Sequence, residues 1–352
     1  MIISPFSYRQ RQTDMDIIIK TGYNEIDTQH WTDFVSHHPK GSIFQTPQMY
    51  RCYVHTPQEA PLVMAAYVNA ELVGLVMAVI IQEKGFLKKH FSTRSIIHSG
   101  PIVKDDDPRI LQALLQAYES QLPKNVIYTE IRNQYDQLCN CDTYRINDYR
   151  FEPHLNFLIP LDNEESIWSR IGKGRLKQIK KAQKNGLTVE TYRHSDITDE
   201  LLRQGYGVIR EVYQRANLPL VDFSQIKAAR DEDILMMFVI RTKEGEFAGC
   251  RYGLSFGKTL YGWYAGSHSR YYPLFPNDML IWETLRWACA NGYKVFDYGG
   301  AGNPNKPYGV RGFKQQMGGE LVDYGRYEKV HTSWKMQIAT KGYAVYRKLF
   351  GF

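Results

Sequence analysis

Residues 62–83, LVMAAYVNAELVGLVMAVIIQE, have the pattern of two β-strands joined by a short polar turn at Asn69-Ala70-Glu71. Residues 235–257, LMMFVIRTKEGEFAGCRYGLSFG, repeat this pattern in the second half of the chain. In each half a helix precedes the hairpin, and a strand, a helix and another strand follow it. Self-similarity of this kind indicates two related domains in tandem.

The order of elements in each half, a three-strand meander followed by a β-α-β crossover, resembles the acetyltransferase (GNAT) fold. We therefore expect an α+β protein with mixed sheets and two tandem GNAT-like domains, residues 1–157 and residues 158–352. The second domain should contain a basic helix at about 164–185 and a helix at its C-terminal end. Asn277 or Asp278 is the expected N-cap of its central helix.

The amino-acid composition restricts the classes of protein to which this chain can belong. The chain has 352 residues, 43% of them apolar and 23% charged, which is ordinary for a globular protein. It lacks an apolar run long enough for a transmembrane helix, and its first residues do not have the pattern of a signal peptide. Five cysteines are few and odd in number, which favours a reducing, cytoplasmic setting. No His/Cys set has the spacing of metal ligands, so a metal is not expected.

Net charge is +7, and the cations are unevenly distributed. Residues 170–184, RIGKGRLKQIKKAQK, hold seven cations and no acid. Lys173, Lys177, Lys180 and Lys184 share one face if this segment is helical. Such a stripe binds phosphates in some proteins and is only a solvated helix face in others, and both interpretations stay open.

The C-terminal stretch, WKMQIATKGYAVYRKLFGF (334–352), mixes aromatic and basic residues. It is typical either of a helix packed on its own domain or of a peripheral contact with an anionic membrane. Both interpretations stay open.

The loop that holds coenzyme A in GNAT domains lies between the central strand and the following helix. There, successive backbone amides point at the pyrophosphate. The corresponding segment 268–276, HSRYYPLFP, has no glycine and two prolines, and proline has no N–H to donate. Its counterpart in the first half, 102–108, IVKDDDP, is acidic. Either the acyl donor is not acetyl-CoA or its pyrophosphate is held differently.

Two GNAT-like domains without this loop resemble the FemABX family, the aminoacyltransferases that build peptidoglycan cross-bridges. The resemblance implies aminoacyl-tRNA as donor and a muramyl-peptide precursor of the cell wall as acceptor. It covers nearly the whole chain and rests on the order of several segments: GSIFQTPQMY (41–50), HSGPIV (98–103), RLKQIKKAQKNGL (175–187), YAGSHS (264–269), MLIWETLRWACANGYKVFDYGGA (279–301) and FKQQMGGELVDYGRY (313–327).

The same resemblance assigns roles to particular residues. Phe313-Lys314 matches a Phe-Lys pair of the family, so Lys314 is expected to bind a phosphate of the tRNA 3′ end or to stabilise the oxyanion. Tyr264 matches a tyrosine near the acceptor, and Arg51 is the nearest match to an expected basic residue. Segment 217–226 lacks the arginine and tyrosine that contact the acceptor in the best-studied branch.

Other candidates come from the residues themselves. Asp297 ends a strand beside glycines, where it could accept a proton, orient an amine or bind loop amides. Tyr298, Tyr308 and Arg311 lie in the glycine-rich segment that follows and are expected to line the cleft. Lys177 and Lys180 are the candidate phosphate ligands on the basic stripe.

The leading hypothesis is therefore a cytoplasmic acyltransferase that moves an aminoacyl group from tRNA to an amine of a peptidoglycan precursor. A first alternative is an acetyl-CoA-dependent N-acyltransferase that acts on an amino sugar for surface polysaccharide. A second is a non-enzymatic module that binds RNA or a membrane through the basic stripe. No nucleophilic triad is evident, since YAGSHS (264–269) lacks the G-x-S-x-G elbow.

Overall fold

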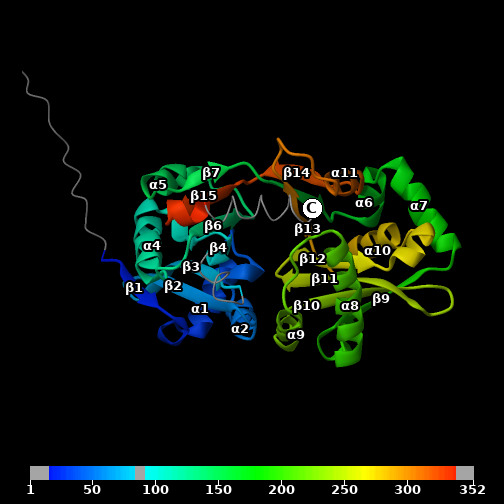
Figure 1. Cartoon of the computed structure of the whole chain (residues 1–352), viewed down its shortest axis with the longest axis horizontal. Coiled ribbons are helices and arrows are strands. Elements are labelled where there is room, and N and C mark those ends of the chain that lie inside the picture. The colour runs from blue at the N-terminus through cyan, green and yellow to red at the C-terminus, as the bar shows by residue number, and fades with distance from the viewer. Residues whose placement is uncertain (1–15, 84–91, 338–352) are drawn as a thin grey trace, which may run out of the picture.

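The computed structural model describes residues 16–83 and 92–337, which form two mixed β-sheets with helices packed on both faces. The first sheet lies on the left of Figure 1 and the second on the right. This arrangement confirms the expected fold of two GNAT-like units. The predicted hairpins are strands β2–β3 and β10–β11, and in the first of them Asn69 and Ala70 adopt the positive φ angles that a tight turn requires.

The first sheet has the strand order β1-β2-β3-β4-β6-β15-β7, with β5 paired to β3. Its elements are β1 (Ile18–Thr21), α1 (Thr28–His37), α2 (Pro47–Val54), β2 (Glu59–Val68), β3 (Glu71–Ile81), β4 (Arg94–Ser99), β5 (Ile102–Val103), α4 (Pro108–Gln121), β6 (Tyr128–Asn133), α5 (Cys141–Ile146), β7 (Arg150–Glu152) and β15 (Arg326–Val330).

The second sheet has the order β14-β8-β13-β12-β11-β10-β9. Its elements are β8 (Leu155–Pro160), α6 (Glu164–Arg170), α7 (Lys173–Lys184), β9 (Thr188–Arg193), α8 (Asp199–Arg215), α9 (Phe223–Asp231), β10 (Leu235–Arg241), β11 (Phe247–Phe256), β12 (Thr259–Ser267), α10 (Pro276–Ala290), β13 (Val295–Gly302), α11 (Arg311–Gln316) and β14 (Glu320–Asp323).

The chain does not divide between the sheets at a single point. Strand β8 spans the predicted boundary at 157/158 and lies wholly in the second sheet, and β15 returns to the first sheet between β6 and β7. The basic helix predicted at 164–185 is two helices, α6 and α7, separated at Ile171 and Gly172. The predicted C-terminal helix lies mostly beyond residue 337, outside the described residues.

Helix α10 begins differently from the prediction. Its N-cap is Phe275, in the left-handed conformation, and not Asn277 or Asp278. Asp278 lies inside the first turn, where its carboxylate pairs with Arg175 of α7 at 3.2 Å. The negative charge is stabilised by the helix N-terminus and by this arginine together.

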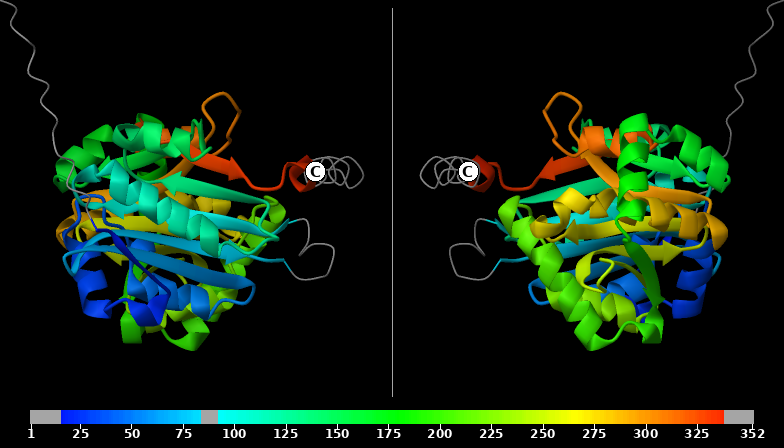
Figure 2. Two further views of the ribbon diagram at one scale, coloured as in Figure 1. Left: turned by 90° about the vertical axis from the view of Figure 1, so that its left-hand side faces the viewer. Right: turned by 90° about the vertical axis from the view of Figure 1, so that its right-hand side faces the viewer.

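One hydrophobic cluster joins the two halves. It contains buried side chains from α1, α2 and the first sheet together with side chains from α8, α9 and the second sheet. Two further clusters lie beneath the outer helices, one between α4 and the first sheet and one between α7, α10 and the second sheet. The side views in Figure 2 show these outer helices covering the sheets. The inner faces of the two sheets are therefore held at a fixed separation.

Helix α8 approaches the second sheet closely at Gly205. A Cβ there would lie 2.6 Å from the Met237 Cε, 2.7 Å from the Tyr252 hydroxyl and 3.0 Å from the Cys250 sulfur. We predict that Gly205→Ala lowers the free energy of unfolding by about 1–3 kcal/mol through overpacking. Gly207→Ala is the matched control, because its Cβ meets open space, and alanine should add about 0.5–1 kcal/mol through helix propensity. Urea denaturation that gave both variants equal stability would contradict this packing.

Candidate active site

Strands β12 and β13 pair only at their beginnings. The parallel pairing joins Thr259–Tyr261 to Val295–Asp297, and β13 then continues beside β8 while β12 continues beside β11. The sheet therefore opens after Tyr261 and Asp297. We call this opening the strand split, and it is where chemistry-bearing side chains of the second domain gather.

Lys314 closes one wall of the strand split. Its Nζ donates to three consecutive carbonyls of β13, those of Tyr298 (2.6 Å), Gly299 (3.1 Å) and Gly300 (2.9 Å). Gly299 has a φ of 74°, which allows the backbone to turn these carbonyls toward the ammonium. An ammonium has three protons, so all of its donors are in use. Lys314 thus fixes the shape of this wall.

The pKa of Lys314 is lowered to about 8. Burial is the main cause, since only 9% of the residue is exposed. The charge of Asp297 raises this pKa and that of Arg251 lowers it further. The ammonium is therefore charged at neutral pH and loses its proton in the mildly alkaline range.

Arg251 of β11 extends its guanidinium to the beginning of β13, beside the strand split, and no sequence pattern singles it out. It is 6% exposed, and its guanidinium lies over the rings of Phe296 and Tyr298 at 5.6 and 5.3 Å. A Cβ at Gly262 would lie 2.7 Å from the Phe296 ring and 3.3 Å from a terminal nitrogen of Arg251, so β12 needs a glycine there. Two aromatic rings partly compensate for the burial of this cation.

The charge of Arg251 is not neutralised by the protein. Among the residues that the structure describes, no carboxylate forms an ion pair with it, and its Nε has no hydrogen-bond partner. Leaving a cation buried and unpaired is costly, and such positions are concentrated at ligand sites. Arg251 is accordingly the strongest anion-binding candidate in the second domain.

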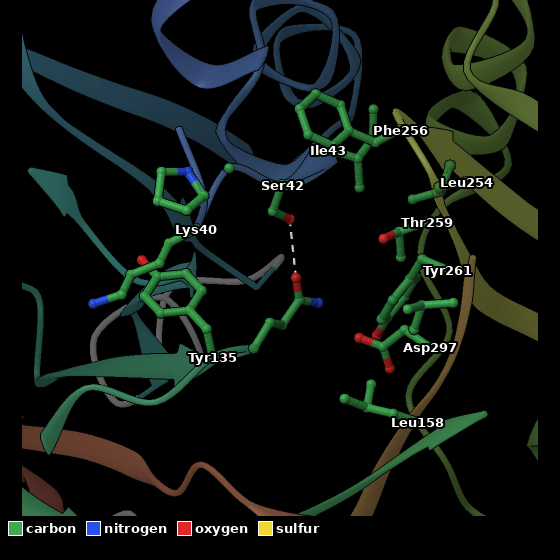
Figure 3. A pocket seen from close by; sticks show the side chains of 14 residues that line it. Lys40, Ser42, Ile43, Tyr135, Leu158, Leu254, Phe256, Thr259, Tyr261 and Asp297 are labelled. Carbon is green, nitrogen blue, oxygen red and sulfur yellow. Dashed lines mark hydrogen bonds between the residues drawn. The ribbon is translucent and has the colours of Figure 1, made fainter. Parts of the chain in front are cut away.

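Asp297 lies on the opposite face of the sheet from Arg251. It is buried, accepts hydrogen bonds from the Gly299 N–H (2.8 Å) and Asn156 Nδ2 (3.0 Å), and burial raises its pKa. It also lines a cavity of about 220 Å³ between the two domains, together with Tyr261. Figure 3 shows its carboxylate facing this cavity. The Asp297 carboxylate thus accepts hydrogen bonds from amide groups and also faces the 220 Å³ cavity.

A larger cavity of about 600 Å³ lies beside this one, also between the domains. Phe44 lines it and packs edge-on against Tyr261 at 4.9 Å, so residues 43–44 separate the two cavities. The predicted residue Tyr264 lines the larger cavity beside Trp263. Polar and charged side chains from both domains complete its walls: Glu59, Glu83, Arg94, His98, Arg132 and Asp222.

One predicted residue of the glycine-rich segment, Tyr298, takes part in the strand split. The Tyr298 ring lies 5.0 Å from the Lys314 ammonium and is buried. Phe313 precedes Lys314 but stacks against Arg175 of α7, 4.5 Å from its guanidinium carbon. Its ring therefore anchors α11 to α7.

The other two predicted cleft residues serve the loop itself. Arg311 donates to the carbonyls of Ala301, Asn303, Pro304 and Lys306, so its guanidinium closes the turn after β13. Tyr308 is 38% exposed and covers Gly302. These contacts place Arg311 among the structural residues of the loop.

Arg51 is held by partners of its own and lines neither of the two cavities described above. Its guanidinium pairs with Glu232 in two hydrogen bonds, of 2.7 and 2.5 Å, and donates to the Tyr23 hydroxyl at 2.9 Å. Glu232 follows α9 of the second domain, so this bidentate pair joins the two domains. The contacts of Arg51 are structural, although the sequence suggested a substrate ligand.

Helix α7 extends outward from the strand split. Its first turn is tied to α11 by a hydrogen bond from the Gly172 N–H to the Gln316 carbonyl (2.8 Å) and by one from Arg175 to the Gln316 side chain (2.9 Å). Lys177 and Lys180 are both exposed along the helix, and Lys180 lies 5.9 Å from the Trp168 ring. The cationic stripe therefore begins beside Lys314.

The N-terminus of α10, where a GNAT domain holds pyrophosphate, is already occupied. The preceding segment is a short 3-10 helix with Pro273 inside it, and the Asp278–Arg175 pair fills the first turn of α10. A carboxylate at this position repels phosphates. This agrees with the prediction from sequence that a usual coenzyme A loop is missing.

Within residues 16–83 and 92–337, no group of three His, Cys, Asp or Glu side chains is placed to hold a metal ion. No helix in the same residues is long and apolar enough to span a membrane.

Comparisons with known proteins agree with this geometry. Residues 173–314 match the model of an acetyltransferase (GNAT) domain. The structure of FemX superposes with a TM-score of 0.70 at 14% identity, covering 91% of this chain and 99% of that one. The C-terminal domain of a putative lysylphosphatidylglycerol synthetase from Agrobacterium fabrum gives a TM-score of 0.59 at 14% identity, covering 90% of this chain and 96% of that one.

A third similar structure is a tandem GNAT protein from the clavulanic acid pathway, with a TM-score of 0.55 at 8% identity and coverage of 90% and 98%. No curated protein matches in sequence. The resemblance to FemABX proteins is thus confirmed at the level of the fold, and the second domain contains the segment that matches the GNAT model.

We predict that Arg251→Met lowers acyl transfer at least about 100-fold, because one oxyanion or phosphate donor is worth roughly 3–4 kcal/mol. The free energy of unfolding should change by no more than about 1 kcal/mol, since a buried unpaired charge is replaced by an apolar side chain. Steady-state kinetics and urea denaturation of the same preparation test both parts. Full activity in this variant would remove Arg251 from the site.

Lys314→Met should lower both the rate of acyl transfer and the free energy of unfolding. Three carbonyls lose their donor, so we expect a loss of about 1–3 kcal/mol in unfolding free energy together with a large loss of activity. Wild-type activity should fall as the pH rises through about 8, because the ammonium loses its proton there. Lys124→Met, at an exposed lysine of the first domain, is the control and should leave stability, rate and pH profile unchanged. A wild-type rate that stays level to pH 10 would contradict a role for the ammonium.

Proposed function

We propose that this protein transfers an aminoacyl group from aminoacyl-tRNA to an amine of a peptidoglycan precursor. The observation that carries the proposal is the strand split of a GNAT-type domain that holds two buried cations, Arg251 and Lys314, while the usual pyrophosphate position is filled by Asp278. The FemX-like fold over nearly the whole chain supports it.

The basic stripe favours a long polyanion as donor. Lys177 and Lys180 lie on a helix that is bonded to α11 at one end and extends away from the strand split. An RNA whose 3′ end entered the split could lay its phosphates along this helix, whereas coenzyme A is too short to use it. The domain-joining cavities at Asp297 and Tyr264 would receive the acceptor from the other face of the sheet.

Transfer of an acyl group from an ester to an amine requires few catalytic groups from the protein. The acceptor amine, after an ammonium has lost one proton to solvent, attacks the ester carbonyl and forms the C–N bond. The C–O bond to the ribose then breaks, and a proton lost by the nitrogen ends on the ribose oxygen, which leaves as the tRNA hydroxyl. Positioning of the two reactants supplies much of the rate. In this scheme Arg251 is the donor aimed at the developing oxyanion or a neighbouring phosphate, and Lys314 holds the carbonyls of β13 so that the wall keeps its shape. No metal and no cofactor other than the donor takes part.

Location follows from the donor. Charged tRNA is found in the cytoplasm, so we place the reaction there, with a lipid-linked acceptor bringing the protein to the inner face of the membrane.

A second candidate keeps the fold and changes the donor to acetyl-CoA, with an amino sugar as acceptor. The match of residues 173–314 to an acetyltransferase model favours it. In that case the pyrophosphate must bind without the usual loop, and Arg251 is the cation available to it. The non-enzymatic alternative predicts RNA or membrane binding that is unaffected by Arg251→Met.

Donor binding separates these candidates. We expect aminoacyl-tRNA to bind at low salt, and we expect the double variant Lys177→Glu/Lys180→Glu to reduce the slope of log K against log salt by about 2. The double variant Lys20→Glu/Lys124→Glu changes the net charge equally, at two exposed lysines of the first domain, and should leave the slope unchanged. Calorimetric binding of acetyl-CoA together with no tRNA binding at 50 mM salt would overturn the proposed donor.

A further inference from the structure

Glu59 stands in the wall of the 600 Å³ cavity near Arg94, whose charge lowers the pKa of Glu59, but the two side chains do not form an ion pair. It is the first residue of β2, and the Gln225 side-chain amide of α9 donates to its Oε2. Gln225 is 2% exposed, so a buried neutral donor from the second domain orients this carboxylate of the first. Its second oxygen is left for whatever enters the cavity.

The cations that share this cavity are engaged elsewhere. Arg94 lies 3.6 Å from Glu83 and donates to the Ser92 carbonyl at 3.2 Å, and the Nε of Arg132 donates to Glu130. Among the described residues no side-chain cation forms an ion pair with Glu59.

The remaining titratable groups of this cavity do not compensate. Burial holds the pKa of His98 down to about 3, so this ring is neutral at pH 7. Asp222 caps α9 through Ser224 and adds negative charge. Burial is also the main reason that the pKa of Glu59 is raised to about 7. The protein therefore keeps a carboxylate partly desolvated and uncompensated at a cavity wall.

We propose that Glu59 binds the ammonium group of the acceptor. The inference rests on the proposed acyl transfer and assigns Glu59 as the residue that recognises the acceptor amine in its charged form, before the amine loses a proton to react. An ammonium brings three donors and a positive charge, which are what this carboxylate lacks. Trp263, Tyr264 and Tyr206 line the same cavity and present aromatic rings, which attract cations.

The test measures acceptor binding without any donor. The probe is Nα-acetyl-lysine amide, and its neutral analogue is Nα,Nε-diacetyl-lysine amide; each is titrated at pH 8 and followed by NMR. We expect the wild type to prefer the amine and Glu59→Gln to bind it at least about 10-fold more weakly. Glu25→Gln removes a carboxylate at an exposed position of the first domain, outside this cavity, and should bind the amine within about 2-fold of the wild type.

Two results would overturn the inference: wild type that binds the amine no better than the neutral analogue, or Glu59→Gln that binds the amine as tightly as wild type. Glu59→Asp keeps the charge and should keep the preference for the amine, which guards against a purely structural effect of the first variant. Glu59→Gln should also melt at a higher temperature than wild type at pH 8 and at an equal temperature at pH 4. Above its folded pKa of about 7 the wild type carries an unfavourable charge, which is absent at low pH.

This result is separable from that of the donor experiment. An amine site that depends on Glu59 while tRNA does not bind would leave the acceptor site standing and reject the donor. Transfer from tRNA with amine binding that is independent of Glu59 would reject the acceptor site alone.

Discussion

The strand split depends on one ammonium group held by three consecutive carbonyls. If Lys314 were absent, the carbonyl oxygens of Tyr298, Gly299 and Gly300 would lack a hydrogen-bond donor in a partly buried space. The positive φ at Gly299 would then no longer be stabilised by this contact. The same contact brings α11 onto β13, and α11 in turn holds α7 through Gln316. The shape of the split, the loop beside it and the direction of the basic helix all follow from this group.

This arrangement indicates a structural role for Lys314, where the sequence suggested a substrate ligand. A cation that is expected to bind substrate usually has free donors, but the protons of Lys314 are in use. The neighbouring Arg251 has the opposite character, a buried guanidinium with aromatic rings on its faces and an unpaired Nε. The two cations therefore differ in role. An ammonium whose three protons are hydrogen-bonded stabilises the structure, whereas a buried guanidinium without an ion-pair partner is available to bind an anion.

The sequence was sufficient for the two hairpins because a long apolar run interrupted by a polar turn is a local signal. It also singled out Lys314, Tyr298 and Asp297 in one stretch of the chain, and these residues lie beside one another in the structure. Arg251 could not be found in this way. It lies inside CRYGL, an ordinary strand, and its importance comes from strands β12 and β13 packing over it.

Arg51 and Arg311 show the converse limit. A sequence reveals that an arginine is present but not which groups its guanidinium binds. Arg51 binds a carboxylate distant in the chain, and Arg311 binds loop carbonyls. Glu59 was missed for the same reason, because its partner Gln225 is 166 residues away. Pairings of this kind follow from tertiary contacts and have no local signal.

The second sheet separates the two halves of the proposed reaction. Side chains alternate along a strand, so Arg251 faces α10 while its neighbours Cys250 and Tyr252 face α8 and the first domain. Tyr261 and Asp297, which are paired across β12 and β13, face the first domain as well. A donor anchored at Arg251 and an acceptor held by Glu59 would therefore approach from opposite faces of one sheet. They can meet where the sheet is open, and it opens directly after the Tyr261–Asp297 pair, at the position that Lys314 keeps in shape.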